Sequence, residues 1–267
     1  MNYVVSGRLG DFLHVLYVVW FHSATGGHGS PATLYVSSSR RYGGEPFGRP
    51  LEETLGDLQA FVERWCPYIA RLVPLGDHDA PPDVAVNLNL WRTMHGRSDW
   101  ISSLHRYYGL TPLVPSQTPA WCEACDGRRP PRPQAEPYVV VHRSHVRHNL
   151  AFPWGTWLDA CRRRGWSVWF LTASPDEYAA FPWKHTVSFK HTPTLCEMAQ
   201  WMHHAEWVIA NQSSPLALAV SLGKRCLVEL NPDRLDAVCY MHSPLSNGEV
   251  YWFYNAHQHR LPGDLEI

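Results

Sequence analysis

Residues 3–14 of the chain read Tyr3-Val4-Val5-Ser6-Gly7-Arg8-Leu9-Gly10-Asp11-Phe12-Leu13-His14. Its first residues form a short apolar run, and apolar side chains recur at helical spacing from Phe12 to His22, which predicts a strand followed by a helix. Gly7 and Gly10 allow a tight turn between the strand and the helix. A strand, a glycine turn and a helix in this order are typical of an α/β domain built on a parallel sheet.

The same alternation of strand and helix continues along both halves of the chain. The first half predicts further strands at 33–37, 69–75 and 83–88 and helices at 51–68 and 100–108. The second half predicts strands at 138–142, 167–172, 187–189, 207–210 and 225–230 and helices at 154–164, 176–181, 194–204 and 215–222. Strands that alternate with helices indicate parallel sheets covered by helices.

A Pro-rich segment separates the two halves. Residues 128–137 read Arg-Arg-Pro-Pro-Arg-Pro-Gln-Ala-Glu-Pro, and the prolines keep such a segment extended and exclude helix. We therefore expect an N-terminal Rossmann-like domain at 1–127, a linker at 128–137 and a C-terminal Rossmann-like domain at 138–267. The predicted fold class is α/β, with two parallel sheets that face a cleft. Open α/β sheets bind ligands at the carboxyl ends of their strands.

The composition excludes several classes of protein. Of the 267 residues, 45% are hydrophobic and 18% are charged, which is typical of a globular chain. The formal net charge of -1 gives no overall attraction to nucleic acid or to an anionic membrane. No apolar run approaches the roughly 18 residues that span a bilayer. The chain start lacks the basic residues of a signal peptide, and the seven scattered cysteines suit a reducing compartment, so we expect a cytoplasmic protein.

Cys122 and Cys125 are the only closely spaced cysteines. A tetrahedral zinc site needs four ligands, and the sequence holds no second Cys-x-x-Cys pair. We therefore expect free thiols and no metal site.

Asp11 lies where the first loop passes into the first helix. A carboxylate at this position often caps the free N–H groups of the helix terminus. A carboxylate that points into a cleft acts instead as a general base when it lies within hydrogen-bond reach of an attacking hydroxyl. Spacing alone leaves both roles open. The loop is not a Walker A loop, which ends in Gly-Lys-Ser/Thr, and it lacks the third glycine of a dinucleotide fingerprint.

A second strand-turn-helix motif runs from Asn211 to Gly223, as Asn-Gln-Ser-Ser-Pro-Leu-Ala-Leu-Ala-Val-Ser-Leu-Gly. Gln212, Ser213 and Ser214 occupy the predicted turn, and Pro215 suits a first helical position. Hydroxyl groups and free N–H groups at such a helix start bind phosphate without a lysine. An ordinary Ser-Ser-Pro helix start is the alternative.

Basic and hydroxyl side chains follow the first strand of the second half. Arg143, Ser144 and Arg147 lie in this loop, and arginines at the carboxyl end of a strand fit phosphate binding. A solvated basic loop is the alternative. Glu229 ends the strand that follows the Ser-Ser-Pro helix, where a carboxylate can accept hydrogen bonds from a ribose. A surface or capping role for Glu229 is equally open.

These motifs, in this order, resemble the heptosyltransferase-like glycosyltransferases of family nine, which have the GT-B fold. The family's Gly-Asp loop carries its catalytic aspartate, so the resemblance implies that Asp11 is the base. The segment Phe152–Leu158 and the strand at 166–171 resemble the Trp-Pro step, helix and strand of the family's second domain. The stretch from Asn211 to Gly223 resembles its donor-phosphate turn and the Ala-rich helix that follows. The resemblance is weak between about residues 40 and 130.

The chain also departs from the family pattern. Gln212-Ser213-Ser214 stands where the family has Asp-Thr/Ser-Gly, and Ala217 stands where it has a histidine. The chain is shorter than typical members, and short chains of this kind resemble the divergent glycosyltransferases of phages and large viruses, so we expect a viral or bacterial origin. The resemblance therefore implies a nucleotide-sugar donor without specifying the sugar, and an acceptor that is a glycan or a modified nucleobase.

We expect an inverting, metal-independent glycosyltransferase that needs no cofactor besides its nucleotide-sugar. Asp11 would deprotonate the acceptor hydroxyl, and domain closure would exclude water. The expected donor-binding residues are Arg143, Ser144, Arg147, Gln212, Ser213, Ser214 and Glu229. The residues expected on the acceptor side are Gly7, Arg8, Gly10 and His14. The alternatives are a non-catalytic nucleotide- or glycan-binding protein with the same fold, and an enzyme of epimerase-like or phosphate-transfer chemistry.

Overall fold

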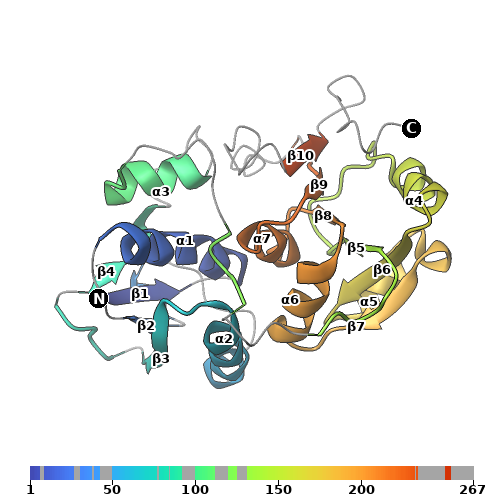
Figure 1. Ribbon diagram of the computed structural model, residues 1–267. Coiled ribbons are helices and arrows are strands. Elements are labelled where there is room, and N and C mark those ends of the chain that lie inside the picture. Colours follow the sequence, from blue (N-terminus) through green and yellow to red (C-terminus); the bar gives the residue numbers. More distant parts are fainter. Residues whose placement is uncertain are drawn as a thin grey trace.

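The computed structural model describes residues 1–6, 9–26, 31–37, 39–42, 50–76, 78–83, 85–91, 100–111, 120–124, 131–231, 233 and 250–253. For Ser6, Arg40 and residues 250–253 it describes the backbone alone. The described residues form two parallel sheets with helices between and around them (Figure 1).

The first sheet has four strands in the order β3-β2-β1-β4, and every pairing is parallel. Its strands are β1 (Asn2–Ser6), β2 (Ala32–Ser37), β3 (Ile69–Leu75) and β4 (Val86–Asn87). The helices of this half are α1 (Leu9–Thr25), α2 (Leu51–Trp65) and α3 (Trp100–Tyr108), with a 3-10 turn η1 (Arg40–Tyr42). Tyr3, Val4 and Val5 make β1 apolar on both faces, which suits a strand inside a parallel sheet.

The second sheet has six strands in the order β10-β9-β8-β5-β6-β7, again all parallel. Its strands are β5 (Tyr138–His142), β6 (Ser167–Thr172), β7 (Ser188–His191), β8 (Trp207–Asn211), β9 (Cys226–Glu229) and β10 (Val250–Phe253). The helices are α4 (Trp154–Arg163), α5 (Pro175–Ala180), α6 (Leu195–His204) and α7 (Ser214–Ser221), with a 3-10 turn η3 (Lys184–Thr186). Every residue of β5, β8 and β9 is buried, as their apolar runs predict.

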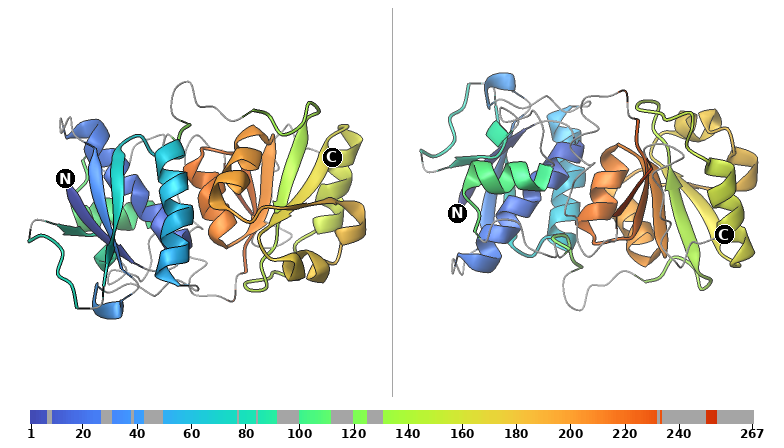
Figure 2. Two further views of the ribbon diagram at one scale, coloured as in Figure 1. Left: turned by 90° about the horizontal axis from the view of Figure 1, so that it is seen from below. Right: turned by 90° about the horizontal axis from the view of Figure 1, so that it is seen from above.

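Two layers of helices lie between the sheets. Helices α1 and α2 cover the face of the first sheet that looks toward the second, and α6 and α7 cover the opposing face of the second sheet (Figures 1 and 2). Helix α1 packs against α7, and α2 packs against α6. Helices α4 and α5 lie on the far side of the second sheet, away from the first (Figure 2).

The facing helices share one hydrophobic core. Residues 12–19 of α1 and 216–221 of α7 are all buried, because each helix has a sheet behind it and the other helix in front. Trp121 joins the halves, since its indole donates to the carbonyl of Leu13 at 3.0 Å and its amide donates to that of Ser221 at 3.0 Å. A large apolar interface of this kind restrains relative domain motion. The domain closure expected from the sequence stays a prediction.

Most expected elements are present, with three differences. The helix expected to reach residue 68 ends at Trp65, because Cys66 precedes a proline and adopts φ -132° and ψ 72°. The strand expected at 83–88 is reduced to β4, and β10 was not expected. The first sheet lies inside the expected domain 1–127 and the second inside 138–267. The exact domain limits stay a prediction, and residues 131–137 hold neither helix nor strand.

Candidate functional site

Four polar side chains end strands of the second sheet. His142, Thr172, Asn211 and Glu229 are the last residues of β5, β6, β8 and β9, and all four are buried. Parallel strands bring their carboxyl ends to one edge of the sheet. This edge and the loops that leave it carry all the donor-side residues expected from the sequence.

Glu229 and Arg143 form a buried ion pair at this edge. The Glu229 side chain has no exposed surface and Arg143 is 9% exposed. Arg143 Nε donates to both carboxylate oxygens, at 3.1 and 2.8 Å, and Nη2 donates to Oε1 at 2.8 Å. The amide of Asn149 and the indole of Trp154 donate to the same carboxylate at 2.7 and 3.2 Å. These hydrogen bonds offset the cost of burying the charges.

The buried pair bears on two predictions. The Glu229 carboxylate is enclosed and accepts from three protein groups, and the ribose contact expected of it stays a prediction. Arg143 shares its charge with Glu229, so it is poorly placed to neutralise a leaving diphosphate. Both residues instead fix the path of the loop that follows β5. Asn149 and Trp154, which the sequence did not single out, belong to this arrangement.

Asn211 fixes the same loop from the end of β8. Its Oδ1 accepts from the amide of Ser144 at 3.0 Å, and its Nδ2 donates to Ser144 Oγ at 3.0 Å and to the carbonyl of Val146. Ser144 therefore lies next to the Gln212-Ser213-Ser214 turn. Its hydrogen bonds to Asn211 hold the loop after β5 in place. No individual role was predicted for Asn211 from the sequence. The sequence feature that could have indicated a role for Asn211 is its amide side chain at the end of an otherwise apolar strand. A polar side chain in that position is buried and must be hydrogen-bonded.

Arg147 reaches the turn that precedes α7. Its Nη1 donates to the carbonyl of Gln212 at 3.3 Å, and Gln212 itself is largely buried. The backbone of Arg147 has a φ of 61°, a left-handed conformation that is uncommon for a residue other than glycine. The hydrogen bonds around the loop hold it in this conformation. The guanidinium thus lies beside the predicted phosphate turn.

Ser213 is the N-cap residue of α7. Its hydroxyl donates to the carbonyl of Asn211 at 3.0 Å and makes no capping hydrogen bond to the helix. Pro215 occupies the first turn, as the sequence predicted. Because the cap side chain turns back toward β8, it does not cap the first turn of α7, where Ser214 and Leu216 carry N–H groups and Pro215 has none. Ser213 and Ser214 are both partly exposed.

Gly10 and Asp11 lie in the first turn of α1, next to α7. A Cβ atom placed on Gly10 would lie 3.5 Å from both Cα and Oγ of Ser214. The two helix starts therefore lie close together, at a distance where a Cβ on residue 10 would make ordinary van der Waals contact with Ser214. Asp11 is partly buried and is the third residue of the helix rather than its N-cap. Gly7 and Arg8 lie outside the described residues.

His14 lies one turn further along α1. Its side chain is buried, and its ring stacks on that of Trp100 in α3 with 4.3 Å between the centroids. Burial lowers the pKa of His14 to about 3, so the ring is neutral near pH 7. The structure therefore places His14 in the core, and the acceptor-side role expected of it stays a prediction.

The cysteines are arranged differently from the sequence motif. Cys122 lies against Cys66, with the sulfur atoms 3.7 Å apart, whereas Cys125 lies outside the described residues. Within the described part of the chain, no three His, Cys, Asp or Glu side chains are grouped so that they could hold a metal ion.

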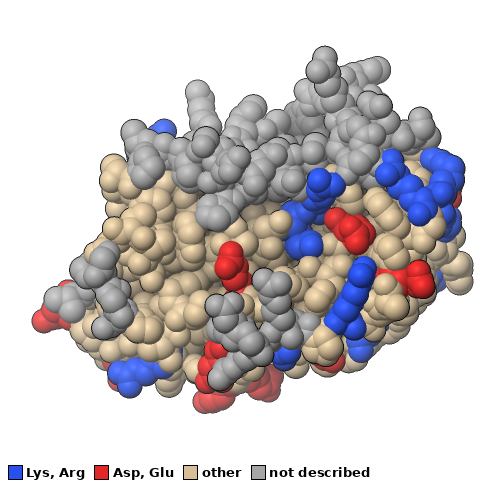
Figure 3. Space-filling view, in the orientation of Figure 1, with Lys and Arg blue, Asp and Glu red and all other residues tan. Residues whose placement is uncertain are grey.

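The surface carries mixed charge. On the face drawn in Figure 3, the described Lys and Arg side chains lie mainly over the second half and are interspersed with Asp and Glu. A DNA acceptor would need a continuous basic groove, and the described part of this face shows none. Among the described helices, none has the length and apolar character needed to cross a membrane.

We compared the chain with protein-family models, curated proteins and solved structures. No family model matches the chain, and no curated protein matches it. Solved structures do match over most of its length. A family 9 glycosyltransferase from Veillonella parvula superimposes with a TM-score of 0.57 and 13% identity, over 94% of this chain and 84% of that one. The E. coli heptosyltransferase WaaC with ADP gives a TM-score of 0.54 and 12% identity, over 98% and 93%.

The iron-containing dodecameric glycosyltransferase TibC from enterotoxigenic E. coli is also similar. Two TibC structures, one of them in complex with ADP-D-beta-D-heptose, give TM-scores of 0.51 and 0.56 at 16% and 15% identity. They match over 85% and 96% of this chain, which spans only 56% and 62% of their length. The chain has the GT-B fold of heptosyltransferase-like glycosyltransferases, which confirms the fold class predicted from the sequence.

Proposed function

We propose that this chain is an inverting glycosyltransferase, which moves a sugar from a nucleotide-sugar to an acceptor hydroxyl without a metal ion. The observation that carries the proposal is the contact between Gly10 and Ser214. Through it, the first turn that bears Asp11 lies beside the N-terminus of α7. A carboxylate next to an anion-binding helix start supplies the two parts that such a transfer needs, a base and a diphosphate site.

The donor diphosphate would bind at the start of α7. The first N–H groups and the helix dipole favour an anion there, and Ser213 and Ser214 add hydroxyl groups. Arg147 would add positive charge as the leaving group departs. Arg143 and Glu229 would not contact the donor. They would position Arg147 by holding the loop that carries it. Bound ADP in WaaC and bound ADP-heptose in TibC support a nucleotide-sugar as the donor.

The reaction would be a single displacement at the anomeric carbon. The acceptor oxygen would attack from the face opposite the diphosphate, and Asp11 would take its proton as the new bond forms. The bond from the anomeric carbon to the diphosphate oxygen would break at the same time. The α7 N-terminus and Arg147 would hold the departing negative charge, a task that a metal ion performs in other enzymes. The acceptor would be a hydroxyl of a glycan or of a modified nucleobase.

The test is the substitution Asp11→Asn, assayed with a panel of nucleotide-sugars for released nucleotide and for donor binding by calorimetry. The carboxamide keeps the shape but cannot take the proton. We expect transfer to fall by about 10²- to 10⁴-fold with donor affinity unchanged. Glu52→Gln is the matched control, because Glu52 is an exposed acid in the first turn of another helix, α2. It should leave transfer intact.

Equal transfer by Asp11→Asn and the wild type would contradict the assignment of the base. A wild-type protein that binds a nucleotide-sugar but neither transfers nor hydrolyses it, over the whole panel, would contradict the enzymatic proposal. It would leave a nucleotide- or glycan-binding protein with this fold.

A further inference from the structure

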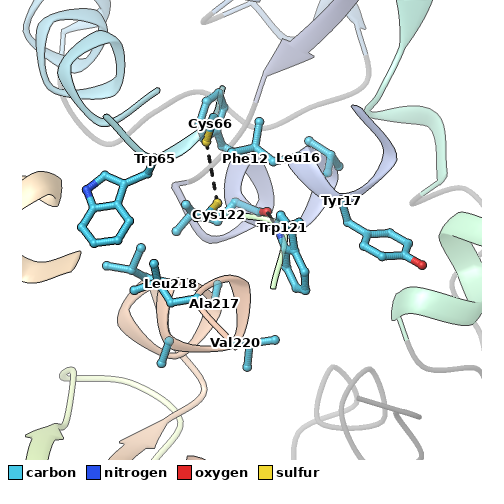
Figure 4. Close-up of a cluster of buried hydrophobic side chains, with 14 of the residues drawn as sticks. Phe12, Leu16, Tyr17, Trp65, Cys66, Trp121, Cys122, Ala217, Leu218 and Val220 are labelled. Atoms are coloured by element: carbon cyan, nitrogen blue, oxygen red, sulfur yellow. Dashed lines mark hydrogen bonds between the residues drawn. The ribbon is translucent and has the colours of Figure 1, made fainter. Parts of the chain in front are cut away.

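Cys66 and Cys122 face each other in the core although they are 56 positions apart. Both side chains are buried, and their sulfur atoms are 3.7 Å apart (Figure 4). Cys66 ends α2 as its C-cap residue. Cys122 lies in the short segment 120–124, where its own amide donates to the carbonyl of Ser221 at the end of α7 at 2.9 Å. The pair therefore lies where the first half of the chain meets α7.

The surroundings of the pair are mostly apolar, and the buried hydroxyl of Tyr68 lies beside both thiols. Figure 4 shows the sulfur atoms among Trp65, Phe12 and Trp121, with residues of α7 close by. Such a site disfavours a charged metal-thiolate centre. The described residues also offer no group of three metal-ligating side chains. A disulfide is uncharged and apolar, so it is the sulfur product that suits this site.

A pocket of about 160 Å³ lies beside the two segments that carry the cysteines, although neither cysteine lines it. Pro67 and Tyr68, which follow Cys66, line it together with Trp121 and Glu123, which flank Cys122. Its volume is several times the roughly 30 Å³ that a water molecule occupies in the liquid. A small oxidant can therefore come close to the chain segments that carry both thiols.

We propose that Cys66 and Cys122 form a reversible disulfide when the protein meets a hydroperoxide, of which hydrogen peroxide is the simplest. One sulfur, as its thiolate, attacks a peroxide oxygen, the O–O bond breaks, and a sulfenic acid and a hydroxide form. The hydroxide takes up the proton that this thiol released and becomes water. The second sulfur then attacks the sulfenic sulfur, the S–O bond breaks, the S–S bond forms, and its proton leaves in a second water. The two thiols lose two electrons to the peroxide.

Burial sets the rate and the consequence of this reaction. Because both side chains are buried and the oxidant reaches them slowly, oxidation should take minutes to hours. The sulfur atoms must approach from 3.7 Å to a bond length of about 2.05 Å, which is a small movement of two side chains. The bond would tie the end of α2 to the segment that contacts α7 and would close a long loop. Long loops restrict the unfolded chain strongly, so the melting temperature should rise by about 5 to 10 °C.

The test uses the whole chain, reduced, freed of reductant and then incubated with hydrogen peroxide. Digestion without reduction and mass spectrometry should reveal a peptide pair joined through Cys66 and Cys122, lighter by two hydrogen atoms. Dithiothreitol should release the pair and reverse the rise in melting temperature. Cys161→Ser is the matched control, because Cys161 is equally buried and burial raises the pKa of its thiol to about 11. This variant should keep the cross-link, and Cys122→Ser should lose it.

Three outcomes would overturn the proposal. They are a cross-link between Cys122 and Cys125 in place of Cys66, conversion of the thiols to sulfinic acids without a cross-link, and Cys66 and Cys122 peptides that stay unmodified. The peptide map of the wild-type chain decides among them without depending on how any variant folds.

Discussion

Gly10 in α1 lies against Ser214 in α7, where the first turns of the two helices meet. A single Cβ on Gly10 would make ordinary contact, at 3.5 Å, with the Cα and Oγ of Ser214. A longer side chain would have to push into the first turn of α7. This contact sets the separation between Asp11 and the proposed diphosphate site, so a change at Gly10 should affect both stability and donor binding.

Gly10→Leu should lower the free energy of unfolding by about 1–3 kcal/mol through overpacking and should weaken donor binding. The matched control is Gly56→Leu. Gly56 is exposed in α2, and a Cβ there would meet no neighbouring atom within 4 Å, so leucine should stabilise by about 0.5–1 kcal/mol through its better helix propensity. Urea denaturation measures both. Equal stabilities of the two variants would show that α7 does not confine position 10.

Glu229→Gln should be strongly destabilising. It leaves the Arg143 guanidinium buried without a countercharge, and breaking a buried pair in this way costs about 3–5 kcal/mol. Asp159→Asn is the control, because Asp159 and Arg162 form an ion pair of the same length, 2.7 Å against 2.8 Å, on the exposed surface. That change should cost less than about 1 kcal/mol. Similar losses in chemical denaturation would contradict a structural role for the Arg143–Glu229 pair.

The sequence predicted most of the fold because local patterns control it. The apolar runs of β5 and β8 and the spacing of α1 and α7 depend on nearest neighbours along the chain. What the sequence did not reveal is the packing of α1 against α7. Both helices are apolar all round, which indicates burial but not the partner that buries them. The short β10 depends on pairing with β9 and has little local signal of its own.

The site was predicted only in outline. Strand ends and the Ser213-Ser214 turn follow from parallel-sheet topology, so the donor-side loops could be placed from the sequence. The roles of individual residues could not be predicted from the sequence, because they depend on side-chain partners far apart in the chain. Glu229 meets Arg143, which is 86 positions away, and His14 meets Trp100. An acid or a histidine in a motif can be buried by such a partner, and no spacing rule reports it.

Arg147→Ala should weaken donor binding through lost positive charge at the α7 turn. We expect about a tenfold loss of affinity or more, in line with about 1.5–3 kcal/mol for a hydrogen bond to a charged group. Arg163→Ala is the matched control, because Arg163 is exposed in the last turn of α4, on the far side of the second sheet. Calorimetry with a nucleoside diphosphate measures the affinities of both variants and of the wild type. Equal affinities would place the diphosphate away from Arg147.

The buried His14 should make the protein sensitive to acid. Its pKa is about 3 in the folded chain, because burial disfavours the charged ring, against 6.5 for an unperturbed histidine. Between these two values the unfolded chain binds a proton that the folded chain does not, so the free energy of unfolding rises with pH. The contribution of His14 is complete above about pH 6.5 and is lost progressively as the pH falls toward 3. At pH 5 the loss is about 2 kcal/mol.

His14→Gln should therefore remove about 2 kcal/mol of the stability difference between pH 7 and pH 5, although it lowers stability at pH 7 through the lost packing on Trp100. Because glutamine does not titrate, the slope, meaning the change in the free energy of unfolding between the two pH values, reports on the histidine, whereas the stability at a single pH also includes the lost packing. His185→Gln is the control, because His185 is exposed beside β7, and it should keep the wild-type slope. Urea denaturation at both pH values measures the slopes. Parallel pH profiles for His14→Gln and the wild type would mean that position 14 takes up its proton equally well in the folded chain.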